Sequence, residues 1–254
     1  MPFEKTIKNV AYLTPVQEDK NFSDLYINLR TREGRFLGFK EIQTLPVAST
    51  KNKHFKEWQM RAKSAQRFVE YLKAEAPFAG VLELGCGNGW FAHLLAKECP
   101  NTKVYGLDIN ELELMQAGQC FHRDNLSFAY ADIIRLNEHS FNEKIDLIVL
   151  NASVQYFDNL PVLFEKLASL MQNNGELHIL DSPFYEKSEI GEAQKRTAHY
   201  YQSIGFREMA KYYFHHCIET VHDFDILYQP KRLGLKRVFG FADSPFPWLR
   251  KVYD

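Results

Sequence analysis

Short apolar runs alternate with helical stretches through the middle of this chain, and that alternation restricts the possible folds more than any other feature. Five runs have the length of strands and few polar interruptions: 81–84, 104–108, 126–130, 145–150 and 177–181. Three helical stretches lie between them: 89–99, 110–121 and 160–171. Apolar strands that alternate with helices are typical of a parallel sheet covered on both faces. We therefore predict an α/β fold built on such a sheet.

The end of the chain follows another pattern. A helical stretch over 193–203 leads to two strand-like runs, 212–218 and 224–228, with a short turn between them. Two such runs joined by a turn predict an antiparallel hairpin.

A glycine-rich loop, Gly85-Cys86-Gly87-Asn88-Gly89, joins the first predicted strand to the first helix. Glycine adopts positive φ and lets a ligand approach the backbone without meeting a Cβ. A tight turn without a ligand needs fewer than three glycines in five residues, so the loop favours a bound ligand. In open parallel sheets, ligands bind at the carboxyl ends of the strands, and this loop lies at such an end.

Glu83 decides between two cofactors for this loop. A dinucleotide site has the spacing GxGxxG and an acid after the next strand for the ribose, and Asp108 suits that ribose role. Here, however, the spacing is GxGxG, and Glu83 lies in the strand just before it. A buried carboxylate is costly unless it is paired, and it would repel a pyrophosphate. The ammonium and sulfonium of S-adenosylmethionine, which carries no phosphate, suit it better.

The stretch from about residue 80 to 182 resembles the class I S-adenosylmethionine-dependent methyltransferases. The motifs that carry the resemblance are E-x-G-x-G-x-G at 83–89, VYGLDIN, YADIIRL, KIDLIVLNASVQYF and LMQNNGELHILD. They occur in the family's order and spacing. The resemblance implies a Rossmann-like, mostly parallel seven-stranded sheet with helices on both faces and a C-terminal antiparallel hairpin. It also implies that S-adenosyl-L-methionine is the cofactor.

The resemblance further implies a set of cofactor-binding residues, all at strand ends or in the glycine loop. They are Glu83, Gly85 and Gly87 along the methionine moiety, Asp108 on the ribose hydroxyls, Ile109 on the adenine, Asp132 and the backbone near Ile133 on the adenine edge, and Asn151 near the sulfonium. Structural roles compete with two of these assignments. Asp108 could cap the helix over 110–121, a role that Asn110 also fits, and Asp132 could cap a turn at Ile133.

The region before the first strand is longer than a methyltransferase core requires. Residues 1–53 show scattered aromatic side chains and no sustained periodicity, and we expect them to form a lead or lid segment that excludes water. The methyltransferase domain is then expected over 54–254, beginning with a helix over 54–76. On this helix Arg61 could reach the methionine carboxylate or form a surface salt bridge, with Trp58 in the core.

Composition and short motifs argue against nucleic acid, a membrane and a metal ion as partners. A formal net charge of −1 gives no general attraction to nucleic acid or to an anionic membrane, and NASV stands where nucleobase amino methylation would show N-P-P-[YF]. No apolar run approaches the ~18 residues of a membrane span, the N-terminus shows no signal-peptide pattern, and the four cysteines form no CxxC pair. We expect a cytoplasmic location and no metal site.

We therefore predict an enzyme that methylates a small molecule or a biosynthetic intermediate. Aromatic side chains in DSPFYEKS, YYQSIGF and SPFPWL suggest a partly apolar or ring-bearing acceptor. Candidates for a base, where one is needed, are Asp181, His199, His215 and His216, and none of them leads. The methylated atom (O, N, C or S) stays open. A non-catalytic S-adenosylmethionine-binding module is the alternative, and an NAD(P)-dependent oxidoreductase is disfavoured by Glu83.

Overall fold

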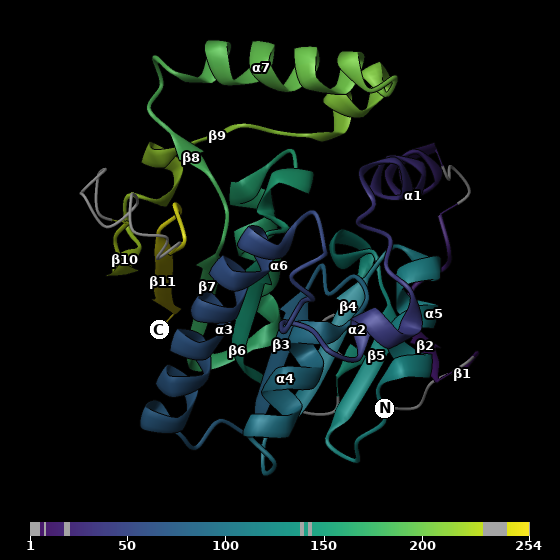
Figure 1. Ribbon diagram of the computed structural model, residues 1–254. Coiled ribbons are helices and arrows are strands. Elements are labelled where there is room, and N and C mark those ends of the chain that lie inside the picture. Colours follow the sequence, from purple (N-terminus) through teal and green to yellow (C-terminus); the bar gives the residue numbers. More distant parts are fainter. Residues whose placement is uncertain are drawn as a thin grey trace.

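A nine-stranded sheet forms the centre of the protein (Figure 1). The computed structural model describes residues 6–7, 9–17, 21–137, 140–141, 144–230 and 243–253. The strand order is β1-β2-β5-β4-β3-β6-β7-β11-β10. Their bounds are β1 Thr6–Ile7, β2 Val10–Tyr12, β3 Gly80–Leu84, β4 Lys103–Asp108, β5 Leu126–Tyr130, β6 Ile145–Asn151, β7 Met171–Leu180, β10 Asp225–Tyr228 and β11 Trp248–Tyr253.

The parallel core of this sheet confirms the prediction from the apolar runs. β5, β4, β3, β6 and β7 pair in parallel, and each overlaps one of the five expected strands. Two N-terminal strands extend the predicted seven: β2 lies parallel beside β5, and β1 pairs antiparallel with β2. The order reverses at β3, from which β4 lies to one side and β6 to the other. Ligands bind at such a switch point in open α/β sheets.

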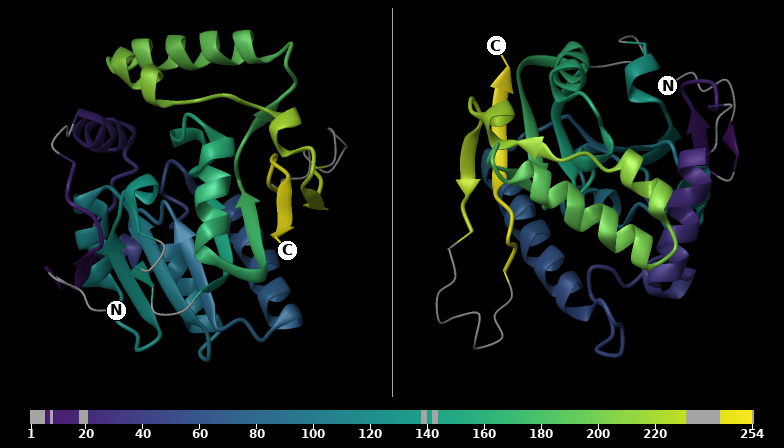
Figure 2. Two further views of the ribbon diagram at one scale, coloured as in Figure 1. Left: turned by 180° about the vertical axis from the view of Figure 1, so that it is seen from behind. Right: turned by 90° about the horizontal axis from the view of Figure 1, so that it is seen from above.

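Helices cover both faces of the sheet, because strand residues alternate between two cores. Val81 packs in the core under α3 (Phe55–Glu75), α4 (Trp90–Glu98) and α5 (Glu111–Cys120), whereas Leu82 packs on the opposite face with α6 (Leu160–Leu170). Figure 2 shows α6 on the rear face of the sheet, and the short α2 (Phe39–Ile42) buries Ile42 in the front core. Among the described residues, no helix is long and apolar enough to cross a membrane.

The C-terminal antiparallel pair is present, but the prediction of its first strand was wrong. β10 pairs with β11, which also pairs antiparallel with β7. The run expected at 212–218 instead contains the end of a 3₁₀ turn, η4 (Arg207–Tyr212), and the short β9 (His216–Cys217), which pairs in parallel with β8 (Phe184–Tyr185). The side chains of Tyr212 and Tyr213 pack in a separate aromatic cluster. The side chains of this run therefore do not alternate between the two faces of a sheet.

That aromatic cluster holds together a cap, which we define as α1 (Asn21–Glu33), α7 (Ile190–Ser203) and η4. Leu29, Tyr201 and Met209 are buried at its centre. The Tyr200 hydroxyl of α7 donates a hydrogen bond to Glu33 of α1 (2.5 Å). Seen from above, α1 and α7 lie side by side over the strand ends (Figure 2). Helix α1 lies within the segment for which the sequence predicted no regular structure.

Candidate functional site

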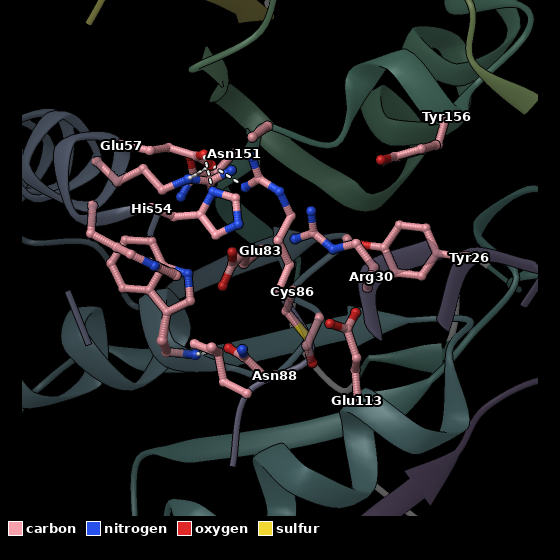
Figure 3. Close-up of a pocket in the computed structure, with 18 of the residues that line it drawn as sticks. Tyr26, Arg30, His54, Glu57, Glu83, Cys86, Asn88, Glu113, Asn151 and Tyr156 are labelled. Atoms are coloured by element: carbon pink, nitrogen blue, oxygen red, sulfur yellow. Dashed lines mark hydrogen bonds and ion pairs between the residues drawn. The ribbon is translucent and has the colours of Figure 1, made fainter. Parts of the chain in front are cut away.

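A cavity opens at the carboxyl ends of β3 and β6, beneath α1 and beside α3 (Figure 3). The space inside it, its open mouth included, is about 770 Å³. Of the predicted cofactor-binding residues, Glu83, Gly85, Gly87 and Asn151 line it. Side chains of α1 and α3, which both precede β3 in the sequence, form the other wall.

The glycine loop brings bare backbone to the cavity wall. Gly85 has a φ of 77°, and a Cβ there would lie 2.5 Å from the Cβ of Ser153, so only glycine fits between the loop and the segment after β6. Gly87 has a φ of 52°, and a Cβ at this position would lie 3.0 Å from Oε2 of Glu113. The packing around the loop therefore requires glycine, and the missing side chains also leave the cavity open for a ligand.

Glu83 is a buried acid of the cavity with one unsatisfied oxygen. Its side chain is 2% exposed, and its Oε2 has no hydrogen-bond partner in the part of the chain that the structure describes. Burial raises the pKa of this carboxyl well above its usual range, against the lowering effects of the Ala92 backbone amide and the Arg61 charge. A buried carboxyl with one oxygen left without a partner fits a cationic ligand group, such as an ammonium, which would return it to the ionised form.

Arg61 lies at the Glu83 end of the cavity and is held by an acid on the same helix. Its Nε donates to Glu57 Oε1 (3.2 Å), which also accepts from Arg35 Nη1 (2.7 Å). Burial raises the pKa of Glu57, but the hydrogen bond from Arg35 and the charge of Arg61 outweigh it and lower that pKa to about 2. Arg61 thus forms the salt bridge that was one of its two expected roles, and it also lines the cavity. Its contact with the methionine carboxylate stays a prediction.

Asp108 lies behind the glycine loop and does not line the cavity. Its Oδ2 accepts from the Gly87 amide (2.7 Å) and its Oδ1 from the Asn110 amide (2.8 Å). Burial nevertheless raises its pKa. The cap of α5 is Asn110, whose Oδ1 accepts from the amide of Glu113 (3.1 Å). Ile109 is partly buried against the front core.

Asp132 and Ile133 also lie outside the cavity lining. Asp132 caps the 3₁₀ turn η1 (Ile133–Arg135) through the Ile134 amide (3.2 Å), and its Oδ2 accepts from Gln17 Nε2 (3.1 Å). The Ile133 side chain is 3% exposed and packs in the rear core, so its backbone is the part that a ligand could meet. The ribose and adenine assignments of these residues stay predictions.

Two buried amide oxygens face the same cavity from the end of β6. Asn151 is 8% exposed, and its Oδ1 has no hydrogen-bond donor among the described residues. Oε1 of Gln155, in the 3₁₀ turn η3 (Val154–Tyr156), is likewise buried and unsatisfied there. Buried polar atoms are rarely left without a partner, so these oxygens indicate a ligand that carries donors.

Sequence reasoning missed four charged residues of the cavity, Arg30, Arg35, Glu57 and Glu113. Burial, together with the charge of Asp108 and against that of Arg30, raises the pKa of Glu113 to about 7. A signal for Glu113 existed, because it lies on the same inward helix face as Ala117, four residues on. None existed for Arg30, since α1 itself was not predicted.

The suggested bases lie away from the cavity. Asp181, His199, His215 and His216 are absent from its lining. Asp181 Oδ1 accepts from Ser64 Oγ (2.8 Å) and from Ser244 Oγ (2.7 Å).

Comparison with known proteins gives a consistent result. A family model described as a methyltransferase domain matches residues 79–230, more than half of the chain. The chain is 32% identical over 97 residues to a malonyl-[acyl-carrier protein] O-methyltransferase of Acetivibrio thermocellus, covering 38% of this chain and 33% of the relative. It is 34% identical over 113 residues to trans-aconitate 2-methyltransferase of Deinococcus radiodurans, covering 44% and 42%. The chain thus spans less than half the length of these relatives.

A solved structure shares the fold over nearly the whole chain. It is magnesium protoporphyrin IX methyltransferase from Synechocystis PCC 6803 with bound S-adenosylmethionine, at a TM-score of 0.56 and 17% identity, covering 95% of this chain and 100% of that one. The strand order, the glycine loop at the switch point and the matched family model agree. The chain therefore belongs to the family of class I S-adenosylmethionine-dependent methyltransferase domains.

Proposed function

We propose that this protein transfers the methyl group of S-adenosylmethionine to a small-molecule acceptor. The observation that carries the proposal is the buried carboxyl of Glu83, which has no hydrogen-bond partner on Oε2 within the described chain and which shares its end of the cavity with Arg61. An acid and a guanidinium at one end of a cavity suit the ammonium and carboxylate of an amino acid. When bound, the cofactor supplies an electrophilic methyl group on its sulfonium.

The remaining predicted residues extend this arrangement along the cofactor. Gly85 and Gly87 would line the methionine moiety with backbone. Asp108 would accept from the ribose hydroxyls: its two observed hydrogen bonds use about half of the roughly four acceptor positions of a carboxylate. Ile109 would pack on the adenine, and Asp132 with the backbone of Ile133 would bind the adenine edge.

The acceptor would enter between the end of β6 and the cap. Asn151 would lie near the sulfonium, so the space above it is where the methyl group leaves. Positioning of donor and acceptor supplies much of the rate of such a displacement. We propose that the segment 1–53, through α1, excludes water from this space. The relatives named for malonyl-[acyl-carrier protein] and trans-aconitate support an acceptor of metabolite type.

Calorimetry with S-adenosylmethionine and S-adenosylhomocysteine tests the cofactor part of the proposal. We expect both to bind, and Asp108→Ala to abolish the binding, because the ribose loses its acceptor. Asp124→Ala, which removes an exposed acid, is the control and should bind normally. Tight binding of NAD without binding of S-adenosylmethionine would refute the proposal.

Turnover separates an enzyme from a non-catalytic binding module on the same fold. The protein is incubated with S-adenosylmethionine labelled on its methyl group and with a small-molecule extract. We expect labelled product that Asp108→Ala does not form. Cofactor binding without any transfer to extract would favour the binding module.

A further inference from the structure

In the described part of the chain, Arg30 is one of three arginines that line the cavity, and the cofactor contacts proposed above do not use it. It lies on α1, its side chain is 23% exposed, and it lines the cavity with Tyr26. Its Nε is buried without a hydrogen-bond partner among the residues that the structure describes. In Figure 3 its side chain reaches from the side of Tyr26 into the cavity.

The acids near Arg30 do not satisfy it. Glu33 Oε2 lies 4.0 Å from Nη1 of Arg30, and Glu33 already pairs with Arg35 (3.3 Å) and accepts from the Tyr200 hydroxyl. The negative charge of Glu113, across the cavity, stabilises the positive charge of Arg30. No hydrogen bond joins the side chains of Glu113 and Arg30 in the described structure. A buried guanidinium nitrogen without an acceptor is costly, so this geometry indicates an anionic ligand group.

The cofactor carboxylate is an unsuitable source for this anion. In an amino acid, the carboxylate and the ammonium share one carbon, so both must lie at the same end of the cavity. Glu83, the proposed partner of the ammonium, is influenced by Arg61. Arg61, on α3, donates to Glu57 (3.2 Å) and lies 5.5 Å from the centre of the Trp58 ring. Arg30, on α1, instead lies 5.4 Å from the centre of the Tyr26 ring. We therefore assign the cofactor carboxylate to Arg61 and the anion at Arg30 to a second ligand.

The surroundings of Arg30 describe the group that it would hold. The Arg30 guanidinium lies 5.4 Å from the centre of the Tyr26 ring, and Tyr26 meets Tyr156 edge to face at 5.5 Å between ring centroids. Tyr156 also lines the cavity, with its hydroxyl directed inward in Figure 3. A planar guanidinium flanked by phenol rings suits a planar carboxylate, which it can bind through two parallel hydrogen bonds.

We propose that Arg30 binds a carboxylate of the methyl acceptor, so that the protein selects small anionic carboxylic acids. This inference rests on the proposed function, since it takes the acceptor to share the cavity with the cofactor. Arg30 is a specificity-determining residue in this proposal, and it orients the acceptor by one carboxylate whichever atom receives the methyl group.

Calorimetric titration of the protein saturated with S-adenosylhomocysteine tests the proposal, with malonate as the anionic probe. Malonamide, a neutral compound of the same shape, is the control ligand. We expect malonate to bind and malonamide to bind at least 10-fold more weakly. Arg30→Met should weaken malonate binding about 10-fold or more, because a hydrogen bond to a charged group is lost, while changing the affinity for S-adenosylhomocysteine less than threefold.

Arg32→Met is the matched control variant, because it removes the same charge from an exposed position of the same helix. It should bind malonate like the wild type. Arg30→Gln is made beside Arg30→Met, so that misfolding of one variant leaves the comparison intact. Unchanged malonate binding by the Arg30 variants, equal binding of malonamide, or no malonate binding by the wild type would overturn the inference alone. Failure of the wild type to bind S-adenosylhomocysteine would overturn the proposed function as well.

Discussion

Replacing Glu83 by glutamine tests the central electrostatic argument about the cavity. The amide keeps the shape of the side chain and a neutral oxygen for the ammonium, but it removes the charge. A hydrogen bond to a charged group contributes about 1.5–3 kcal/mol, and this one forms at a side chain that is 2% exposed, where water screens little. We therefore take the upper part of that range. Glu83→Gln should bind S-adenosylhomocysteine roughly 30–150-fold more weakly.

The same substitution should not destabilise the protein without ligand. The pKa of Glu83 is raised above its unfolded value, so the native state holds a proton that the unfolded chain releases. Stability conferred by this site is then greatest below the unfolded pKa and falls as the pH rises toward the native pKa. Glutamine removes this loss, so the thermal midpoint of Glu83→Gln at neutral pH should equal or exceed that of the wild type.

Calorimetry in buffers of different ionisation enthalpy makes the prediction specific. Binding of the ammonium should ionise Glu83 and release a proton, so the wild-type affinity should rise with pH and the variant should lack this proton release. 5′-Methylthioadenosine, which has no amino-acid end, should bind both proteins equally. If glutamine leaves the affinity for S-adenosylhomocysteine unchanged, or weakens both ligands alike, Glu83 does not hold the ammonium.

Two further predictions concern the glycine loop and the acid beside it. Gly85→Ala should lower the unfolding free energy by about 2 kcal/mol or more, because the new Cβ meets Ser153 at 2.5 Å on a backbone with positive φ; chemical denaturation measures the loss, and an unchanged midpoint would contradict it. Glu113→Gln should flatten the pH dependence of the unfolding free energy. The native pKa of Glu113 is about 7 against an ordinary 4.5, so the wild type should lose about 3 kcal/mol of unfolding free energy between pH 4.5 and pH 8. If the variant loses as much, another group titrates.

The parallel core could be predicted from the sequence because each strand is buried on both faces. Such strands appear as apolar runs, as Ile145–Asn151 does, whose seven residues are all buried. The glycine loop and Glu83 were found for the same reason, since a charge or a flexible residue stands out in an apolar context. The apolar runs, the glycine loop and Glu83 can each be recognised within a short stretch of sequence. The resemblance to the family's motifs then indicated the order in which these elements follow one another.

One helix of the cap, α7, confirms the helical stretch predicted over 193–203. The rest of the cap could not be predicted, because its stability comes from contacts between distant segments. Helix α1 buries Leu29 against Met209 and Tyr201, more than 170 residues further along the chain, and its other positions are largely polar or partly exposed. Nothing near α1 in the sequence indicates those contacts. The hairpin prediction failed for a related reason, since the partner of β10 is β11, beyond residues 231–242, which lie outside the described part of the chain.

The two walls of the cavity have different origins in the chain. One wall, the glycine loop with the end of β6, lies inside residues 79–230, the region shared with the family. The other, formed by α1 and α3, precedes that region entirely. Under the two proposals, Arg30 on α1 would select the acceptor, whereas Glu83 on the shared wall and Arg61 on α3 would hold the cofactor. Mutations in α1 should therefore change which acceptors bind while the binding of S-adenosylmethionine is kept, and a fragment cut to residues 79–230 would lose both arginines.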